Sequence, residues 1–185
     1  MRWRLLRLWV ACCVFSSMAF CDVLENENLL YNLPKNYKVG FQTKKNGMVM
    51  TELIPQQESI NQWTEMVTAQ IFLGLKTLSP EQFQTRMETL WSKACPNAQF
   101  ATVTQGEENG YAFLIWMQMC PLNQTTGKPE NTWFKAIKGN DSFYVVQKAF
   151  TYDPSKEEVV TWMHYFQSVK VCDTRRAESP CPSVK

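Results

Sequence analysis

The sequence has one histidine, His164, and no two cysteines separated by two residues. Any histidine-dependent triad or metal site would need that single side chain, and a Cys-x-x-Cys redox site is excluded. Helical spacing places His164 on the side opposite Trp162 and Phe166, where polar residues gather. We therefore expect His164 to be exposed rather than catalytic.

Glycines are few and scattered, so the sequence has no glycine-rich loop for phosphate. Charge is also nearly balanced. The formal charge of +2 includes Arg2, Arg4 and Arg7 at the N-terminus, and removing these three positive charges leaves −1. A nearly neutral chain has no global field that would attract nucleic acid, so no nucleic-acid partner is predicted.

The arginines precede an apolar run over residues 8–20, the layout of a secretory signal peptide. This run is shorter than the roughly 20 apolar residues that a membrane span needs. We predict a signal peptide over residues 1–21, cleaved after Ala19 or Cys21. Lipidation of Cys21 is less favoured because Phe20 is bulky, and an uncleaved anchor remains an alternative. No later apolar run is long enough to span, so the mature chain is expected to be periplasmic or secreted.

Four cysteines follow the leader: Cys95, Cys120, Cys172 and Cys181. In an oxidising compartment an even set of this kind indicates disulfides, and four cysteines allow three pairings. Closing the shortest loops favours Cys95–Cys120 and Cys172–Cys181. Buried free thiols are the alternative.

Residues 131–150 are typical of a β-hairpin, because aromatic and β-branched residues alternate with polar ones around a turn at residues 139–141. Trp133, Lys135 and Ile137 share one face of the first strand. Both faces carry apolar groups, which predicts that the hairpin lies inside a larger sheet.

Further elements follow from turn and capping signals. Strands are expected at residues 37–43, 48–54, 99–104 and 111–120, the last covered on both faces. Helices are expected at residues 60–73, 80–95 and 156–169. The order predicts an α+β fold, an antiparallel sheet of about six strands with three helices packed on it.

The predicted organisation is a single domain over residues 37–172. An irregular arm over residues 22–36 precedes it and docks through Leu29, Leu30 and Tyr31. A polar tail over residues 173–185 follows and is tethered by its cysteine.

The element order resembles the Mog1/PsbP-type α/β/α sandwich. At the level of sequence, residues 63–68, the helix end at residues 94–96 and residues 133–144 resemble a family of exported bacterial proteins of unassigned function. The resemblance covers most of the mature chain. It implies export and a fold, and it brings no catalytic residues.

Trp133, Lys135 and Tyr144 are the candidate binding residues, since amphipathic rings beside lysines on a sheet face are common anchors. The alternative is that helices cover both rings. The favoured function is a non-catalytic exported domain that binds a protein partner or small ligand at the sheet face or an adjacent groove. A structural envelope component is one alternative.

The other alternative is a carboxylate-dependent hydrolase that uses Glu52, Glu65 and Asp141, the acidic groups nearest to apolar residues.

Two Met-x-Met pairs, Met48/Met50 and Met117/Met119, have the thioether chemistry that suits Cu(I). Each pair lies on one face of a predicted strand, where methionine also packs well in a core. Core packing is the preferred interpretation, so no metal and no cofactor are predicted.

Overall fold

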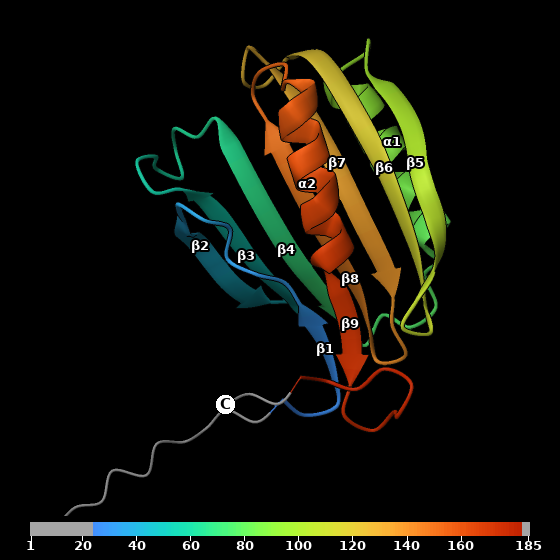
Figure 1. The fold of residues 1–185 in the computed structure, drawn as a ribbon. Helices are drawn as coiled ribbons and strands as arrows, with labels where there is room; N and C mark the ends of the chain where they lie inside the picture. Colours follow the sequence, from blue (N-terminus) through green and yellow to red (C-terminus); the bar gives the residue numbers. More distant parts are fainter. Residues whose placement is uncertain (1–23, 183–185) are drawn as a thin grey trace, which may run out of the picture.

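The computed structural model describes residues 24–182 (Figure 1). The signal peptide predicted for residues 1–21, with both cleavage positions, lies outside the described residues. The elements in chain order are β1 (Glu27–Leu30), β2 (Tyr37–Lys45), β3 (Met48–Pro55), β4 (Glu65–Leu73), α1 (Pro80–Ala94), β5 (Gln99–Glu108), β6 (Tyr111–Asn123), β7 (Lys128–Lys138), β8 (Ser142–Phe150), α2 (Lys156–Ser168) and β9 (Lys170–Asp173).

Seven strands form one antiparallel sheet in the order β2-β3-β4-β8-β7-β6-β5, and β1 pairs with β9 in a separate two-stranded sheet. Strand β8 is therefore central, and β6 lies second from one edge. Helix α2 crosses one face of the sheet, and α1 lies on the other face toward the β5–β6 end (Figure 1). The predicted α+β class and antiparallel sheet are confirmed, with one helix fewer and more strands than expected.

The predicted hairpin is confirmed as β7 and β8, whose register sets Trp133 opposite Lys148 and Ile137 opposite Tyr144. Both predicted capping boxes that begin at Ser79 and Ser155 are also present, and they start α1 and α2. In each, the serine hydroxyl accepts from the N3 backbone N–H while the N3 side chain binds the N-cap N–H.

The helix predicted for residues 60–73 is wrong, because strand β4 occupies Glu65–Leu73 and residues 60–64 form the turn before it. Ser59 and Gln62, interpreted as a capping box, instead form an isolated bridge before the strand. Val67 faces one core cluster and Phe72 contacts the other. Apolar residues on both faces hide the two-residue period of a strand, and pairing with both β3 and β8 outweighs the local helix signals.

Each face of the sheet carries its own core cluster. The cluster under α2 includes Trp133, Tyr144, Phe150, Trp162 and Phe166. The cluster under α1 is built on Trp116, Phe134 and Phe143, with the Trp116 and Phe134 rings stacked 4.7 Å apart. Two helices on opposite faces therefore bury most of the hairpin, and each leaves part of its face uncovered.

Both predicted disulfides are present. Cys95–Cys120 joins the end of α1 to β6, with Cα atoms 5.9 Å apart. Cys172–Cys181 joins β9 to the C-terminal segment, with Cα atoms 4.9 Å apart. Both separations suit a disulfide.

The N-terminal arm is more regular than predicted, since it contains strand β1 paired with β9. Leu29 and Tyr31 pack against the cluster under α2, while Leu30 is partly buried. The partner strand β9 lies at least 140 residues away along the chain, from Leu30 to Lys170, which is why the local sequence gave no sign of the pairing. Among residues 24–182, no helix is both long and apolar enough to cross a membrane.

Candidate functional site

Two lysines are buried between the sheet and α2. Lys135 on β7 is 1% exposed and Lys148 on β8 is 0% exposed. The β7–β8 register points both side chains to the α2 side. A buried ammonium is tolerated only when it is paired and hydrogen-bonded, so the partners of these lysines define the interior of the site.

Lys148 is enclosed by a carboxylate and aromatic rings. Its Nζ lies 2.6 Å from Glu65 Oε2 and donates to the Tyr37 hydroxyl at 2.7 Å. The Tyr37 hydroxyl in turn donates to the same Glu65 oxygen at 2.7 Å. The ring centroids of Trp162 and Phe150 lie 4.0 and 4.4 Å from Nζ, within the range of cation–π contacts.

Burial shifts the ionisation of this cluster. It lowers the pKa of Lys148 to about 8, although Glu65 opposes the change. Burial would raise the pKa of Glu65, but hydrogen bonds from Lys148 and Tyr37 hold that pKa below its ordinary value. Burial and the hydrogen bond to Glu65 raise the pKa of Tyr37. At neutral pH the cluster is a charged lysine–glutamate pair bridged by a neutral phenol.

Lys135 stabilises the end of α2 from the sheet below it. Its Nζ donates to the backbone oxygens of Phe166 at 2.9 Å and Val169 at 2.7 Å, and to Glu108 Oε2 at 2.7 Å. The last turn of α2 has no basic residue of its own. Lys135 therefore gives the Val169 carbonyl a donor and adds a second donor to the Phe166 carbonyl, which also accepts from the Val169 backbone N–H. Its charge opposes the negative end of the helix dipole. Burial lowers the pKa of Lys135, and Glu108 opposes that shift.

Tyr144 fastens the N-terminal arm. Its hydroxyl donates to Glu27 Oε1 at 2.8 Å, and the Glu27 carboxylate accepts from the backbone N–H groups of residues 140–142 at 2.7 to 3.3 Å. A side chain at Gly139 would collide with this carboxylate, so the turn needs glycine there. Burial, and then the Glu27 hydrogen bond, raise the pKa of Tyr144.

Trp133, Lys135 and Tyr144, the candidate binding residues, are only 5%, 1% and 2% exposed. The expectation that Trp133 and Tyr144 present their rings on an accessible concave surface is therefore corrected. The rings belong to the core under α2 because a strand covered on both faces turns its aromatic side chains into the packing. Lys135 differs from the other two, since it also borders a surface groove.

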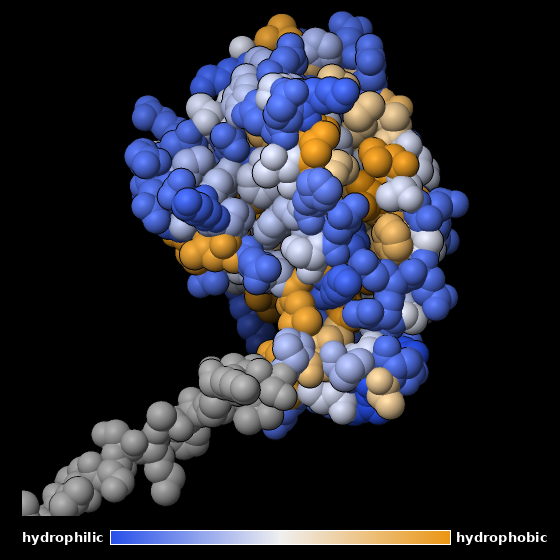
Figure 2. All heavy atoms as spheres, viewed as in Figure 1, coloured by the Kyte–Doolittle hydropathy of each residue, from blue (hydrophilic) through white to orange (hydrophobic). Residues whose placement is uncertain are grey.

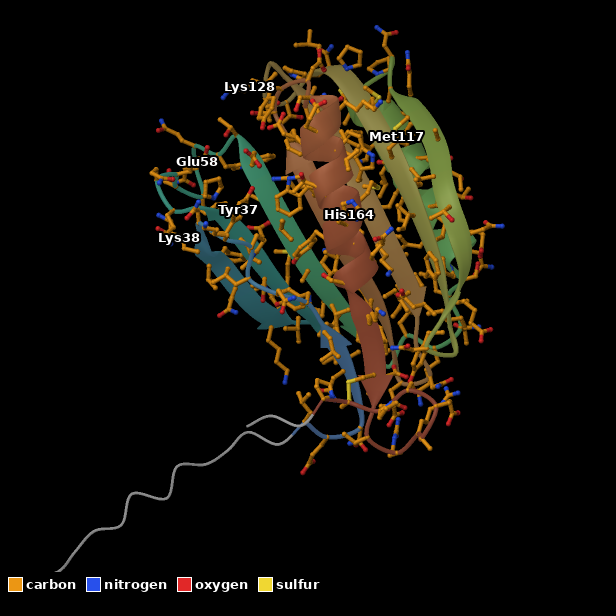
Figure 3. The ribbon with its side chains drawn as sticks, viewed as in Figure 1. Tyr37, Lys38, Glu58, Met117, Lys128 and His164 are labelled. Carbon is orange, nitrogen blue, oxygen red and sulfur yellow. A yellow bond between two sulfur atoms is a disulfide. The ribbon has the colours of Figure 1, made fainter. Side chains whose placement is uncertain are left out.

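That groove, the α2–β5 groove, has a volume of about 260 Å³. Strand β5 contributes Val103, Thr104 and Glu108, β6 contributes Phe113 and Ile115, β7 contributes Lys135, and α2 contributes Met163 and Gln167. Figure 2 shows apolar surface gathered beside α2 on the β5–β6 side, and Figure 3 places Met117 of β6 there. A bulge lies between Thr102 and Thr104 on β5, where Val103 is 46% exposed.

A second hollow of about 280 Å³ borders the same face of β6. It is lined by Gln99, Met119, Pro121, Pro129, Asn131 and Asp153. Met119 and Ile115 lie four residues apart on β6 and so point to the same side of the sheet. The α2–β5 groove has the more apolar lining of the two.

The three candidate carboxylates are not brought together. Glu52 lies opposite Thr68 on β4, three residues from Glu65, so these two point to opposite faces of the sheet. Burial raises the pKa of Glu52, whereas that of Glu65 is lowered. Asp141 lies in the β7–β8 turn and binds Arg175 at 2.6 Å. This arrangement gives no support to a shared carboxylate active site.

His164 is exposed on α2, as predicted, with Nδ1 3.2 Å from Gln167 Oε1 (Figure 3). Within residues 24–182, no cluster of three or more His, Cys, Asp or Glu residues could hold a metal ion.

Sequence reasoning missed the partners of the buried groups. Glu108 lies between the predicted strands at residues 99–104 and 111–120, and Glu27 lies in the arm that is predicted to be irregular, yet they pair with Lys135 and Tyr144. A signal was present, because a lysine inside an apolar strand needs a buried acidic partner. The sequence alone does not say which of the dispersed acidic residues supplies it.

No family model and no curated protein matches the chain. Matching solved structures include the Ran-binding protein Mog1p of Saccharomyces cerevisiae, at 12% identity and a TM-score of 0.43 over 77% of this chain and 85% of that one. Cyanobacterial PsbP from Synechocystis matches at 10% identity and a TM-score of 0.47, over 81% of this chain and 95% of that one.

LpqN of Mycobacterium tuberculosis, involved in cell envelope biogenesis, matches at 12% identity and a TM-score of 0.43, over 82% of this chain and 86% of that one. Mog1 and PsbP are the two proteins that the element order resembles. At this level of similarity the matches concern the fold, and no function is transferred from them.

Proposed function

We propose that this chain is an exported, non-catalytic binding domain whose α2–β5 groove receives an apolar side chain of a protein partner. The observation that carries the proposal is the groove's chemistry. Its walls are largely apolar, and its two charged residues, Lys135 and Glu108, already pair with each other at 2.7 Å. An apolar group would therefore enter without leaving a new charge unpaired.

The size of the groove favours one side chain over a complete ligand. Sites for drug-sized molecules span roughly 300–1,000 Å³, and the groove holds about 260 Å³. Burying one large aliphatic side chain contributes about 1.5–3 kcal/mol. That contribution suits one anchor within a wider protein contact, where a few residues carry most of the binding energy.

Two further observations support the non-catalytic and exported parts of the proposal. The groove contains a single carboxylate, Glu108, which is held by Lys135. Glu52, Glu65 and Asp141 lie elsewhere and apart from one another, which counts against the hydrolase alternative. The two disulfides fit an oxidising compartment outside the cytoplasm.

The direct test is a matched pair of substitutions. Val103 lines the groove on edge strand β5, and Val39 lies on β2, the opposite edge strand of the sheet; they are 46% and 49% exposed. The probe is N-acetyl-leucine amide, and its binding is monitored through the methyl NMR signals of Ile115 and Met163. We expect both methyl signals to shift when the probe binds. Val103→Arg should weaken the affinity for the probe at least about tenfold, which corresponds to about 1.4 kcal/mol. Val39→Arg should leave the response to the probe unchanged.

A photo-reactive amino acid at Gln167, on the groove wall, would extend the test to the native envelope. We expect a discrete crosslinked protein whose yield falls with Val103→Arg and persists with Val39→Arg. A purely structural component would give equal yields in both variants. Methyl groups that ignore the probe, together with crosslinks insensitive to Val103, would refute the groove as a binding site.

A further inference from the structure

One of the two Met-x-Met pairs converges on a single point. Met48 and Met50 lie two residues apart on β3 and therefore on the same face of the sheet. Gln70 pairs with Met50 from the neighbouring strand β4. Its Nε2 lies 3.7 Å from the Sδ atom of Met48 and 3.7 Å from that of Met50. The two thioethers thus flank one position, which the Gln70 amide now occupies.

Core packing does not account for this pair. Helix α1 covers the Trp116, Phe134 and Phe143 cluster on the β6–β8 side of the same face. Met48 and Met50 belong to neither buried cluster, and both are only partly buried. The preferred sequence interpretation, that methionine spacing reflects a core, therefore does not hold for this pair.

The Gln70 amide is oriented from the other side. Gln147 Nε2 donates to Gln70 Oε1 at 2.8 Å, which turns the Gln70 amino group toward the two sulfurs. Thioether sulfur is a weak hydrogen-bond acceptor, so these two contacts are easily exchanged. Thioethers bind soft metal ions far better than they accept hydrogen bonds from amides.

The other Met-x-Met pair provides a comparison within the same molecule. Met117 packs against the cluster under α2, and Met119 lines the hollow beside Asp153. Within residues 24–182 these two sulfurs share no hydrogen-bond donor. Equal spacing in the sequence therefore yields convergent sulfurs on β3 only.

The nearby charges are compatible with a monovalent cation. Glu52 is the next residue on the same face of β3 and is partly buried. Lys45 lies opposite Met48 but is exposed, so its ammonium reaches solvent. A single positive charge between the two neutral sulfurs would thus lie near the Glu52 carboxylate, while solvent screens its repulsion from the Lys45 ammonium.

We propose that Met48 and Met50 form a binding site for a soft monovalent metal ion of the Cu(I) or Ag(I) class on the β3–β4 surface. The site is separate from the α2–β5 groove, because it lies on the opposite face of the sheet. It does not depend on the proposed function. Gln70 forms the third wall of the site and moves aside when the ion binds.

Silver(I) is the probe, because it is soft and does not change oxidation state under the conditions used. The full chain is treated with N-ethylmaleimide to block free thiols, labelled with ¹³C at the methionine methyl groups, and titrated with silver nitrate in chloride-free buffer. We expect the Met48 and Met50 methyl signals to shift first and to saturate together at one equivalent.

Leucine substitutions keep the apolar volume and remove the sulfur. Met48→Leu and Met50→Leu should each lower silver affinity at least about tenfold. Removing a residue that only orients a metal ligand already costs about 10–100-fold in affinity, so removing the ligand itself should cost at least as much. Met117→Leu/Met119→Leu is the matched control and should change affinity less than about twofold. Binding that survives in the Met48→Leu/Met50→Leu variant, or no saturable shift at either methyl group, would overturn the proposal.

Discussion

Lys148 and Lys135 lie on adjacent strands beneath the same helix, and both are buried. Lys148 is closed in by rings, with Glu65 as its carboxylate partner. Lys135 instead holds two carbonyls at the end of α2, and one side of its surroundings opens into a groove. The two lysines differ in what surrounds the ammonium group besides its carboxylate partner. Aromatic side chains surround Lys148, and backbone carbonyls at the end of α2 surround Lys135.

This comparison separates two uses of a buried charge. A lysine enclosed by aromatic side chains fixes the helix to the sheet and has no route to a ligand. A lysine that caps a helix end keeps the backbone satisfied while leaving apolar neighbours accessible beside it. The structural and the binding parts of the α2 interface are therefore adjacent but distinct.

The largest effect is expected at Lys148. Lys148→Ala leaves Glu65 without its cation and removes the ring contacts, so we expect the free energy of unfolding to fall by about 3–5 kcal/mol. Urea denaturation at pH 7 measures it. Lys148→Met, which fills the same space, should cost clearly less. A Lys148→Met variant as stable as the wild type would contradict the assigned ion pair, because both substitutions leave Glu65 without its cation.

Lys135→Met should destabilise the protein by about 1–3 kcal/mol, because the Val169 carbonyl loses the Lys135 donor and the Phe166 carbonyl keeps only the Val169 N–H. Glu108 is exposed enough to reach water. Hydrogen exchange should show faster opening of the last turn of α2. Lys170→Met is the control, since Lys170 also approaches Glu108, at 3.9 Å, but is 43% exposed. A loss in the control as large as in Lys135→Met would assign the effect to Glu108 rather than to the helix end.

The pH dependence sharpens the comparison further. The pKa of Lys148 is about 8 in the folded chain against an ordinary 10.5. Between these values the unfolded chain binds the extra proton, so stability rises with pH. From pH 8 to 9.5 we expect the wild type to gain about 1–2 kcal/mol relative to Lys148→Met. Denaturation midpoints of both proteins across this range measure it, and parallel pH profiles would show that Lys148 does not titrate there.

The smallest effect is expected at the surface. Val103→Arg and Val39→Arg should each change the free energy of unfolding by less than about 0.5 kcal/mol, because the two residues are 46% and 49% exposed. Thermal unfolding checks this directly. A large loss for Val103→Arg alone would show that the bulge on β5 is structural and would remove that variant as a binding probe.

The sequence was sufficient wherever the deciding contacts are local. Ser79 and Ser155 begin α1 and α2 as predicted, since the cap and its N3 partner lie three residues apart. The turn at residues 139–141 and both disulfides were likewise predictable from turn chemistry and loop length. Strand β4 was not, because its identity depends on β3 and β8, and its two buried faces carry no strand period.

The sequence by itself determined the hairpin, the starts of α1 and α2 and the cysteine pairs, because each follows from residues close together in the chain or from the length of the loop that a disulfide closes. The order of these local elements then indicated the α+β class. Only the tertiary structure decided which acid meets which lysine. Glu65 reaches Lys148 across 83 residues, and Glu108 reaches Lys135 across 27. The same is true of Met48 and Met50, whose spacing equals that of Met117 and Met119 while their surroundings differ. Burial and charge pairing act through space, and the order of residues along the chain does not encode those distances directly.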